Sequence, residues 1–230
     1  MVIGNGMVAA RFASYTSNDD VVIFASGVSN SKNTDPVAYE RETKLLKKTL
    51  EQYPDKLLVY FSTCSLYDPE EKTSPYYNHK LKTEEYIQQT AASYNIFRVS
   101  NIVGRSANQN TILNFFYYHL INRVNFDLWS NTTRNLIDID DMFAITDSIL
   151  QQGLFQNQVT NIANPVSNNV KEIIETLGNV LGIKGNYIPI PKGRHFEIDI
   201  TVILPVIAQL SIPFGRPYLL NLVKKYYPHS

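Results

Sequence analysis

Two short stretches of the sequence carry side chains suited to proton transfer. Residues 62–65, Ser-Thr-Cys-Ser, directly follow the apolar run 57–61, which predicts a buried strand. Tyr76 and Lys80 are spaced i, i+4, which places both on one face of a helix. An ammonium near a phenol favours the phenolate, so the spacing predicts a tyrosine of lowered pKa that serves as general acid or base. We expect the hydroxyl of Thr63 to hydrogen-bond the same substrate oxygen.

The elements that must hold these side chains alternate between strand and helix. Apolar, β-prone runs at 21–25, at 57–61 and ending near 99 predict strands. Helical patterns follow them at about 36–53, 75–92 and 111–122. This alternation is typical of parallel βαβ units and predicts an α/β fold with a doubly wound, Rossmann-like parallel sheet. Ligands of such sheets bind at the carboxyl ends of the strands, where Thr63 lies.

The first residues, MVIGNGMVAARF, predict a phosphate-binding turn between a short strand and a helix. Gly4, Gly6 and Ala9 have the spacing G-x-G-x-x-A, which allows a pyrophosphate to approach backbone amides at a helix N-terminus. A plain strand-to-helix turn with permissive glycines is the alternative interpretation.

Beyond residue 123 the alternation weakens. Short strands are expected within 125–129 and 134–139, a helix before Gly153, and a capped helix from Asn169 to about Gly182. Four prolines in the last fifty residues indicate a small irregular lobe: Pro189, Pro191, Pro205 and Pro213. We therefore predict a Rossmann-like dinucleotide-binding domain over 1–165, with 104–136 partly contributing to the substrate lobe, and a small C-terminal substrate lobe over 166–230.

Composition excludes several classes of function. The formal net charge is zero, whereas nucleic-acid or anionic-membrane surfaces need an excess of Lys and Arg. The single Cys64 cannot form an internal disulfide, and neither a signal segment nor a membrane-spanning apolar run is evident. The cytoplasm is the expected compartment. The histidines show no metal-ligand spacing, so no metal site is predicted: His79, His119, His195 and His229.

Several ordered segments together resemble the extended short-chain dehydrogenase/reductase superfamily, the NAD-dependent epimerase/dehydratase group. They are SPYYNHKL, FSTCSLY, FRVSNIVG, RNLIDIDDM and NIANP, and they span about residues 1–185 with the glycine-rich turn. The resemblance implies that Tyr76 is the catalytic acid/base, with Lys80 as its partner and ribose ligand and Thr63 as the catalytic hydroxyl.

The same resemblance implies the remaining site residues. Cofactor-binding positions would be Gly4, Gly6, Ala9, Ala25, Ser26, Gly27, Lys80 and Val99. Substrate-binding positions would be Ser65, Asn101 and Arg134. The implied cofactor is NAD or NADP, and the implied substrate is a nucleotide-activated sugar. Duller interpretations stay open: Thr63 satisfies strand-end backbone groups, Asn101 forms a turn, and Arg134 makes a salt bridge with Asp138 or Asp140.

This sequence departs from the family pattern in its cofactor half. Only about a dozen residues separate Ala9 from Val21, where the family places a strand, a helix and a further strand. The acid that binds the adenosine ribose normally lies there, and Asp19 and Asp20 are better explained as loop residues. The choice between NAD and NADP therefore cannot be made from the sequence.

A second departure concerns the residues after Thr63. The 4,6-dehydratases of the family carry Asp and Glu there, whereas this chain has Cys64 and Ser65, so we predict no 4,6-dehydratase activity.

Three hypotheses on function result. The leading one is a keto-sugar reductase or an epimerase in surface polysaccharide synthesis. The second is a degenerate family member that binds a dinucleotide weakly or not at all and serves as a regulatory or scaffolding protein. The third is a reductase of a non-sugar carbonyl. The resemblance also implies a possible homodimer through the helix that carries Tyr76, with contributions from Tyr86, Ile87 and Tyr94.

Overall fold

A five-stranded parallel sheet forms the centre of the computed structural model, which describes residues 1–106 and 108–228. In spatial order the strands are β1 (Val2–Ile3), β2 (Val21–Phe24), β3 (Leu57–Thr63), β4 (Tyr94–Val99) and β9 (Gln158–Ile162). Every neighbouring pair is parallel. The predicted α/β class with a Rossmann-like parallel sheet is confirmed.

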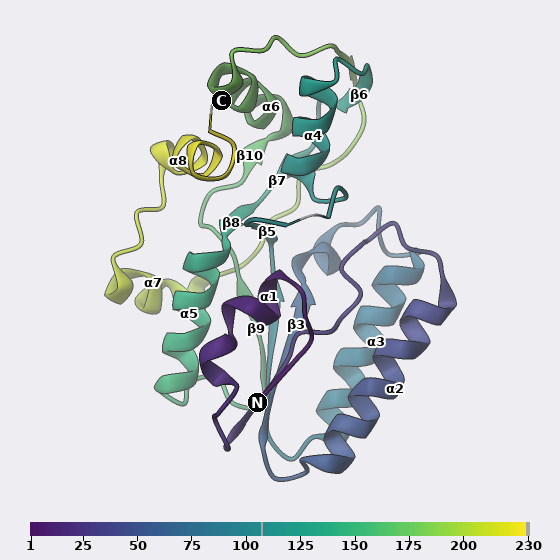
Figure 1. The fold of residues 1–230 in the computed structure, drawn as a ribbon, viewed down its shortest axis with the longest axis vertical. Coiled ribbons are helices and arrows are strands. Elements are labelled where there is room, and N and C mark those ends of the chain that lie inside the picture. Colours follow the sequence, from purple (N-terminus) through teal and green to yellow (C-terminus); the bar gives the residue numbers. More distant parts are fainter. Residues whose placement is uncertain (107, 229–230) are drawn as a thin grey trace.

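Helices cover both faces of this sheet (Figure 1). One face carries α2 (Pro36–Gln52) and α3 (Pro75–Thr90), and the other carries α1 (Met7–Arg11), α5 (Ile139–Gln151) and α7 (Leu204–Leu210). Alternate residues of β3 point to opposite faces, as the pleat requires. Leu58 and Tyr60 pack beneath α2 and α3, whereas Val59 belongs to the core beneath α1 and α5.

The starts of α2 and α3 agree with the prediction because each is encoded by a local cap. The Asp35 side chain accepts a hydrogen bond from Val37 N at 2.9 Å, and Pro36 occupies the first turn of α2. Ser74 accepts from Tyr77 N at 3.1 Å, and Pro75 opens α3. This cap places Tyr76 in the first turn of α3.

A second lobe lies beyond the carboxyl ends of the sheet strands (Figure 1). It contains α4 (Ile112–Ile121), α6 (Val170–Leu181), α8 (Arg216–Tyr226), the parallel pair β6 (Phe126–Trp129) with β11 (Tyr187–Ile190), and the antiparallel pair β7 (Thr133–Arg134) with β10 (Asn168–Asn169). The parallel pair β5 (Asn101–Val103) and β8 (Leu136–Asp138) connects it to the sheet.

Residues 181–228 are more regular than the prediction of an irregular lobe. Pro205 lies in the first turn of α7, where a proline starts a helix, and a 3₁₀ turn, η3 (Thr201–Ile203), precedes it. Ile203 and Ile207 pack on the core of the sheet, whereas Leu219 and Leu222 of α8 pack in the second lobe. Residues 166–228 are therefore divided between the two parts of the molecule.

The N-terminal edge of the sheet is short. Only the 3₁₀ turn η1 (Ala13–Tyr15) stands between α1 and β2, and no strand pairs with the outer edge of β1 within the described residues. None of the helices described is long and apolar enough to cross a membrane.

Candidate active site

A cavity of about 400 Å³ opens at the carboxyl ends of the sheet strands, between the sheet and the second lobe. It brings together nine of the predicted site residues: Gly6, Ala25, Gly27, Thr63, Ser65, Tyr76, Lys80, Val99 and Asn101. Gly4, Ala9, Ser26 and Arg134 do not line it. The segments after β2, β3 and β4 thus converge on one space, as a parallel sheet dictates.

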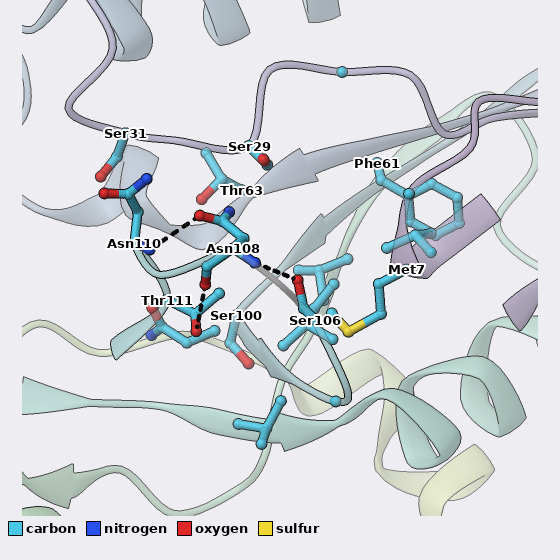
Figure 2. Close-up of a pocket in the computed structure, with 18 of the residues that line it drawn as sticks. Met7, Ser29, Ser31, Phe61, Thr63, Ser100, Ser106, Asn108, Asn110 and Thr111 are labelled. Atoms are coloured by element: carbon cyan, nitrogen blue, oxygen red, sulfur yellow. Dashed lines mark hydrogen bonds between the residues drawn. The ribbon is translucent and has the colours of Figure 1, made fainter. Parts of the chain in front are cut away.

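Thr63 ends β3 and caps the 3₁₀ turn η2 (Cys64–Tyr67). Its Oγ1 accepts a hydrogen bond from Ser65 N at 3.1 Å and donates to Ser65 Oγ, also at 3.1 Å. The structural interpretation of Thr63 therefore applies, since its side chain accepts a hydrogen bond from the backbone N–H of Ser65 at the end of the strand. The residue nonetheless lines the cavity, so capping aims this side chain at the space where a substrate would lie (Figure 2).

Tyr76 is buried in the first turn of α3, with 7% of its surface exposed. Burial raises the pKa of Tyr76, while Lys80 and an interaction with the Thr63 hydroxyl act in the opposite direction without reversing it. The sequence prediction of a lowered pKa was wrong in direction. Lys80 does favour the phenolate, but the loss of water around the ring has the larger effect.

Lys80 shares a face of α3 with Tyr76, as predicted, yet its ammonium is bound elsewhere. Lys80 Nζ donates to Tyr60 Oη at 2.8 Å and to Glu42 Oε1 at 3.2 Å, and it lies 5.9 Å from the centroid of the Tyr76 ring. Burial opposes the charge, but Tyr60 and Glu42 outweigh it and raise the pKa of Lys80. The ammonium is therefore a fixed charge beside the cavity.

The sequence analysis missed Glu42, a fully buried carboxylate on α2. Burial alone would raise the pKa of Glu42, but Lys80, His79, Val28 N and Tyr60 lower it to about 2. One signal was available: Glu42 precedes the buried Leu46 by one turn, so it lies on the apolar stripe of the helix.

His79, for which the sequence analysis predicted no role, joins the same buried cluster, because its Nε2 lies 2.9 Å from Glu42 Oε2.

The glycines of the N-terminal turn have different roles. Gly4 has φ +130°, and a Cβ there would lie 2.4 Å from Ala25 O, so Gly4 lets β1 pack against the end of β2. A Cβ on Gly6 would meet nothing within 4 Å, although this residue lines the cavity. Gly6 therefore leaves open room beside exposed backbone, which suits the pyrophosphate of a dinucleotide.

The residues present fit only part of a dinucleotide. Gly6, Ala25, Gly27 and Val99 surround the space that a nicotinamide and its ribose would need. Asp19 and Asp20 precede β2 and so lie at the amino end of the sheet, where Asp19 is fully exposed, 3.9 Å from Lys56 Nζ. These acids face away from the cavity, in agreement with their interpretation as loop residues.

Arg134 lies on β7, outside the cavity. It donates to Thr133 O at 3.2 Å, and burial lowers its pKa. The expected alternative of a salt bridge to Asp138 or Asp140 was wrong, because both carboxylates instead lie 2.7 Å from Lys225 Nζ. Among the described residues Arg134 has no ion-pair partner.

Asn101 also uses its side chain structurally. Asn101 Nδ2 donates to Asn135 O at 3.0 Å, which ties β5 to the segment before β8. The residue still lines the cavity.

Much of the remaining wall is neutral and polar, and the sequence analysis did not single it out (Figure 2). The residues concerned are Ser29, Ser31, Ser100, Ser106, Asn108, Asn110, Thr111 and Tyr227. Before α4, Asn108 N donates a hydrogen bond to Ser106 Oγ and Asn110 N donates one to Asn108 Oδ1. Among the described lining residues, Lys80 alone is charged.

No cluster of three or more His, Cys, Asp or Glu side chains suited to a metal ion occurs in residues 1–106 and 108–228. His229 lies outside the described residues.

Comparison with known families gives a match to the NAD dependent epimerase/dehydratase family over residues 7–163. This range begins directly after Gly4 and Gly6 and includes every predicted catalytic residue. No curated protein sequence matches the chain.

Solved structures with the same fold share little sequence with this chain. RMD from Pseudomonas aeruginosa, complexed with NADPH, has a TM-score of 0.73 and 14% identity, with 97% of this chain and 96% of that chain covered. UDP-glucuronic acid 4-epimerase from Bacillus cereus, in complex with UDP-glucuronic acid and NAD, has a TM-score of 0.72 and 18% identity, with 90% and 74% covered. dTDP-glucose 4,6-dehydratase from Bacillus anthracis, in complex with NAD, has a TM-score of 0.67 and 17% identity, with 95% and 76% covered.

Proposed function

Since this chain belongs to the NAD-dependent epimerase/dehydratase family, we propose that it is an NAD(P)-dependent enzyme acting on a nucleotide-activated sugar. The proposed reaction is reduction of a keto sugar, or epimerisation through a transient keto sugar. One observation carries the proposal: Thr63, Tyr76 and Lys80 line a single cavity together with Gly6. The similar structures solved with NAD or NADPH support the choice of cofactor.

In this proposal each side chain has a separate role. The Tyr76 hydroxyl gives its proton to the substrate carbonyl oxygen during reduction, and in the reverse direction the Tyr76 phenolate takes a proton from a sugar hydroxyl. Thr63 hydrogen-bonds the same oxygen. Lys80 has a third N–H beyond the two bound to Tyr60 and Glu42, and this donor is suited to the nicotinamide ribose. A bound nicotinamide cofactor supplies or accepts the hydride.

Cys64 supports the exclusion of 4,6-dehydratase activity from the proposal. The thiol is buried and donates to Arg98 O at 3.1 Å, and burial raises the pKa of Cys64 to about 12. A thiol in this state does not act as an acid or base near neutral pH. The neighbouring Ser65 has no carboxyl group to replace the missing pair.

A second candidate function rests on the edge position of β1. No strand lies beyond β1 within the described residues, and Asp19 and Asp20 lie at the end of the sheet opposite the cavity, so neither acid is placed to bind an adenosine ribose there. This observation favours a degenerate member that binds a dinucleotide weakly or not at all and acts as a regulatory or scaffolding protein.

Titration with NADH and NADPH, followed by energy transfer from Trp129 and the tyrosines to the reduced cofactor, separates these candidates. The enzyme hypothesis expects binding of one nucleotide and turnover of a UDP- or dTDP-linked keto sugar. Tyr76→Phe should keep cofactor binding and lose turnover by about 10²- to 10⁴-fold, the usual contribution of general acid–base catalysis. Tyr77→Phe is the matched control, because Tyr77 does not line the cavity.

Two other outcomes redirect the assignment. Failure of both nucleotides to bind supports the scaffolding candidate. Turnover of small ketones with no turnover of nucleotide sugars supports the reductase of a non-sugar carbonyl.

The place in polysaccharide synthesis, the cytoplasmic location and the homodimer remain predictions. The side chain of Ile87 is fully buried against the sheet, so Ile87 cannot contribute to the predicted dimer interface. Tyr86 and Tyr94 are partly exposed and stay available.

A further inference from the structure

Both oxygens of the Glu42 carboxylate are filled by donors from three different elements. Oε2 accepts from Val28 N at 2.6 Å and lies 2.9 Å from His79 Nε2. Oε1 accepts from Tyr60 Oη at 2.7 Å and from Lys80 Nζ at 3.2 Å. A buried carboxylate is stable only when it is paired and hydrogen-bonded in this way. Glu42 is therefore ionised, and it joins α2, β3, α3 and the segment after β2.

This carboxylate determines where the Lys80 ammonium lies. Lys80 Nζ is 4.9 Å from the Tyr60 ring centroid but 5.9 Å from that of Tyr76. Gly27 closes the remaining side, because a Cβ there would lie 2.8 Å from Lys80 Nζ and 3.2 Å from Glu42 Oε1. The backbone of the loop after β2 thus rests directly on the ion pair and leaves Lys80 one direction open, toward the cavity.

We propose that Glu42 is a positioning residue for the proposed reaction: its carboxylate, together with the Tyr60 hydroxyl, holds the Lys80 ammonium at the cavity wall and offsets the lysine charge beside Tyr76. This inference rests on the proposed function. It goes beyond it by assigning a role to a residue that touches neither the substrate nor the cofactor.

The charges around Tyr76 support this role. Lys80 favours the phenolate, whereas the carboxylates of Glu42 and Glu71 disfavour it. Tyr39 of α2 and His79 of α3 stack 4.7 Å apart on the outer side of the cluster, and Tyr60 of β3 lies beneath it. With the lysine charge offset by Glu42, burial has the largest effect and raises the pKa of Tyr76 above its ordinary value.

Glu42→Gln tests the inference, because glutamine keeps the shape and an acceptor oxygen but removes the charge. We expect the Tyr76 phenolate to form at lower pH in this variant. Tyrosinate absorbance, recorded as a function of pH, measures this without cofactor or substrate. The contribution of Tyr76 is the absorbance difference between a protein with Tyr76 and the same protein carrying Tyr76→Phe. This difference is measured once in the parent and once in Glu42→Gln, and the two titration curves are compared. In the active enzyme, the alkaline limb of the kcat profile for reduction should move to lower pH. At neutral pH kcat should fall about tenfold, because Lys80 loses its fixed position.

Glu84→Gln is the matched control. Glu84 is equally buried, and its carboxylate accepts from Ser62 and from Arg98 at 2.6 Å, but it does not line the cavity. This variant should lose stability while leaving the Tyr76 titration and the alkaline limb unchanged.

Tyr60→Phe provides a second, milder variant that removes only the hydroxyl between Lys80 and Glu42. It should move the Tyr76 titration to lower pH, by a smaller amount than Glu42→Gln. If Glu42→Gln does not fold, the result for Tyr60→Phe decides whether the inference holds.

The inference is overturned if the folded Glu42→Gln protein, or Tyr60→Phe in its place, titrates Tyr76 where the parent does. An equal shift in Glu84→Gln overturns it as well, since the effect would then be a general loss of packing. Absence of turnover in the parent with every nucleotide sugar refutes the proposed function instead, while the absorbance titration still decides the role of Glu42.

Discussion

The two sides of the cavity are built very differently. On the β3–α3 side, Thr63 is capped against Ser65, Tyr76 follows the Ser74 cap, and Lys80 is held by two buried partners. On the β1–α1 side, a strand of two residues and a helix of five form the edge of the sheet. The groups proposed for proton transfer are thus held by several independent contacts. The β1–α1 side, where the cofactor is proposed to bind, depends instead on close backbone packing such as that of Gly4 against Ala25.

This contrast shows which part of the family architecture the chain retains. Proton transfer needs side chains placed to within a fraction of an ångström, and the buried cluster around Glu42 provides that placement. Dinucleotide affinity is spread over a long molecule, so a short edge at β1 would be expected to affect the adenosine side more than the nicotinamide side. The following predictions test the contrast, from the largest expected effect to the smallest.

The first prediction concerns acid stability on the β3–α3 side. The pKa of Glu42 is about 2 in the fold against an ordinary value of 4.5, so its charge adds stability above pH 4.5 that is lost as the pH falls toward 2. The advantage of the parent over Glu42→Gln should shrink by about 3 kcal/mol across this range, at about 1.4 kcal/mol per pKa unit. Urea unfolding at a series of pH values measures it. A difference that does not vary with pH would contradict the assignment.

The second prediction concerns Gly4 on the β1–α1 side. Alanine at this position combines a φ of +130° with a Cβ placed 2.4 Å from Ala25 O, so the strand must move away from β2. We expect a loss of about 2 kcal/mol in the free energy of unfolding, typical of a strained backbone position. Thermal unfolding measures the loss, and an unchanged melting temperature would show that β1 adds little to stability.

The third prediction uses Gly6 as the counterpart of Gly4. Its φ of −81° suits any residue, and an added Cβ meets nothing within 4 Å. Gly6→Ala should therefore melt like the parent but bind NADH about tenfold more weakly, because the methyl group fills room needed by the pyrophosphate. Fluorescence titration measures the affinity. Equal affinity in variant and parent would remove Gly6 from the cofactor site.

The smallest effect is expected at the loop acids. Asp19→Asn and Asp20→Asn should leave the ratio of NADH to NADPH affinity unchanged, since both residues lie at the amino end of the sheet. The same titration provides the measurement. A changed ratio would place one of these acids at the ribose and would contradict the fit described above.

Local signals account for what the sequence predicted correctly. The starts of α2 and α3 are encoded within four residues by Asp35–Pro36 and Ser74–Pro75, and the apolar run before Thr63 defines β3. The placement of Thr63, Tyr76 and Lys80 at one cavity then follows from parallel topology.

Features that depend on distant contacts were missed. Glu42 is bound by Val28, Tyr60 and Lys80, which lie 14, 18 and 38 residues away, and a charged helical residue ordinarily indicates an exposed position. The direction of the Tyr76 pKa shift was wrong for the same reason. The spacing of Tyr76 and Lys80 shows neither that Tyr76 is buried nor that Lys80 is also bound by Glu42. The C-terminal helices were missed because prolines were interpreted as breakers, while Pro205 and Pro217 lie in first turns.

Residues 68–73, between η2 and the Ser74 cap, form mostly exposed turns. The side chains on either side are anchored by their own caps, so extra chain inserted at this point would not shift the reacting groups. The length of this turn can therefore change, in evolution or in engineering, without displacing the capped segments that carry Thr63 and Tyr76.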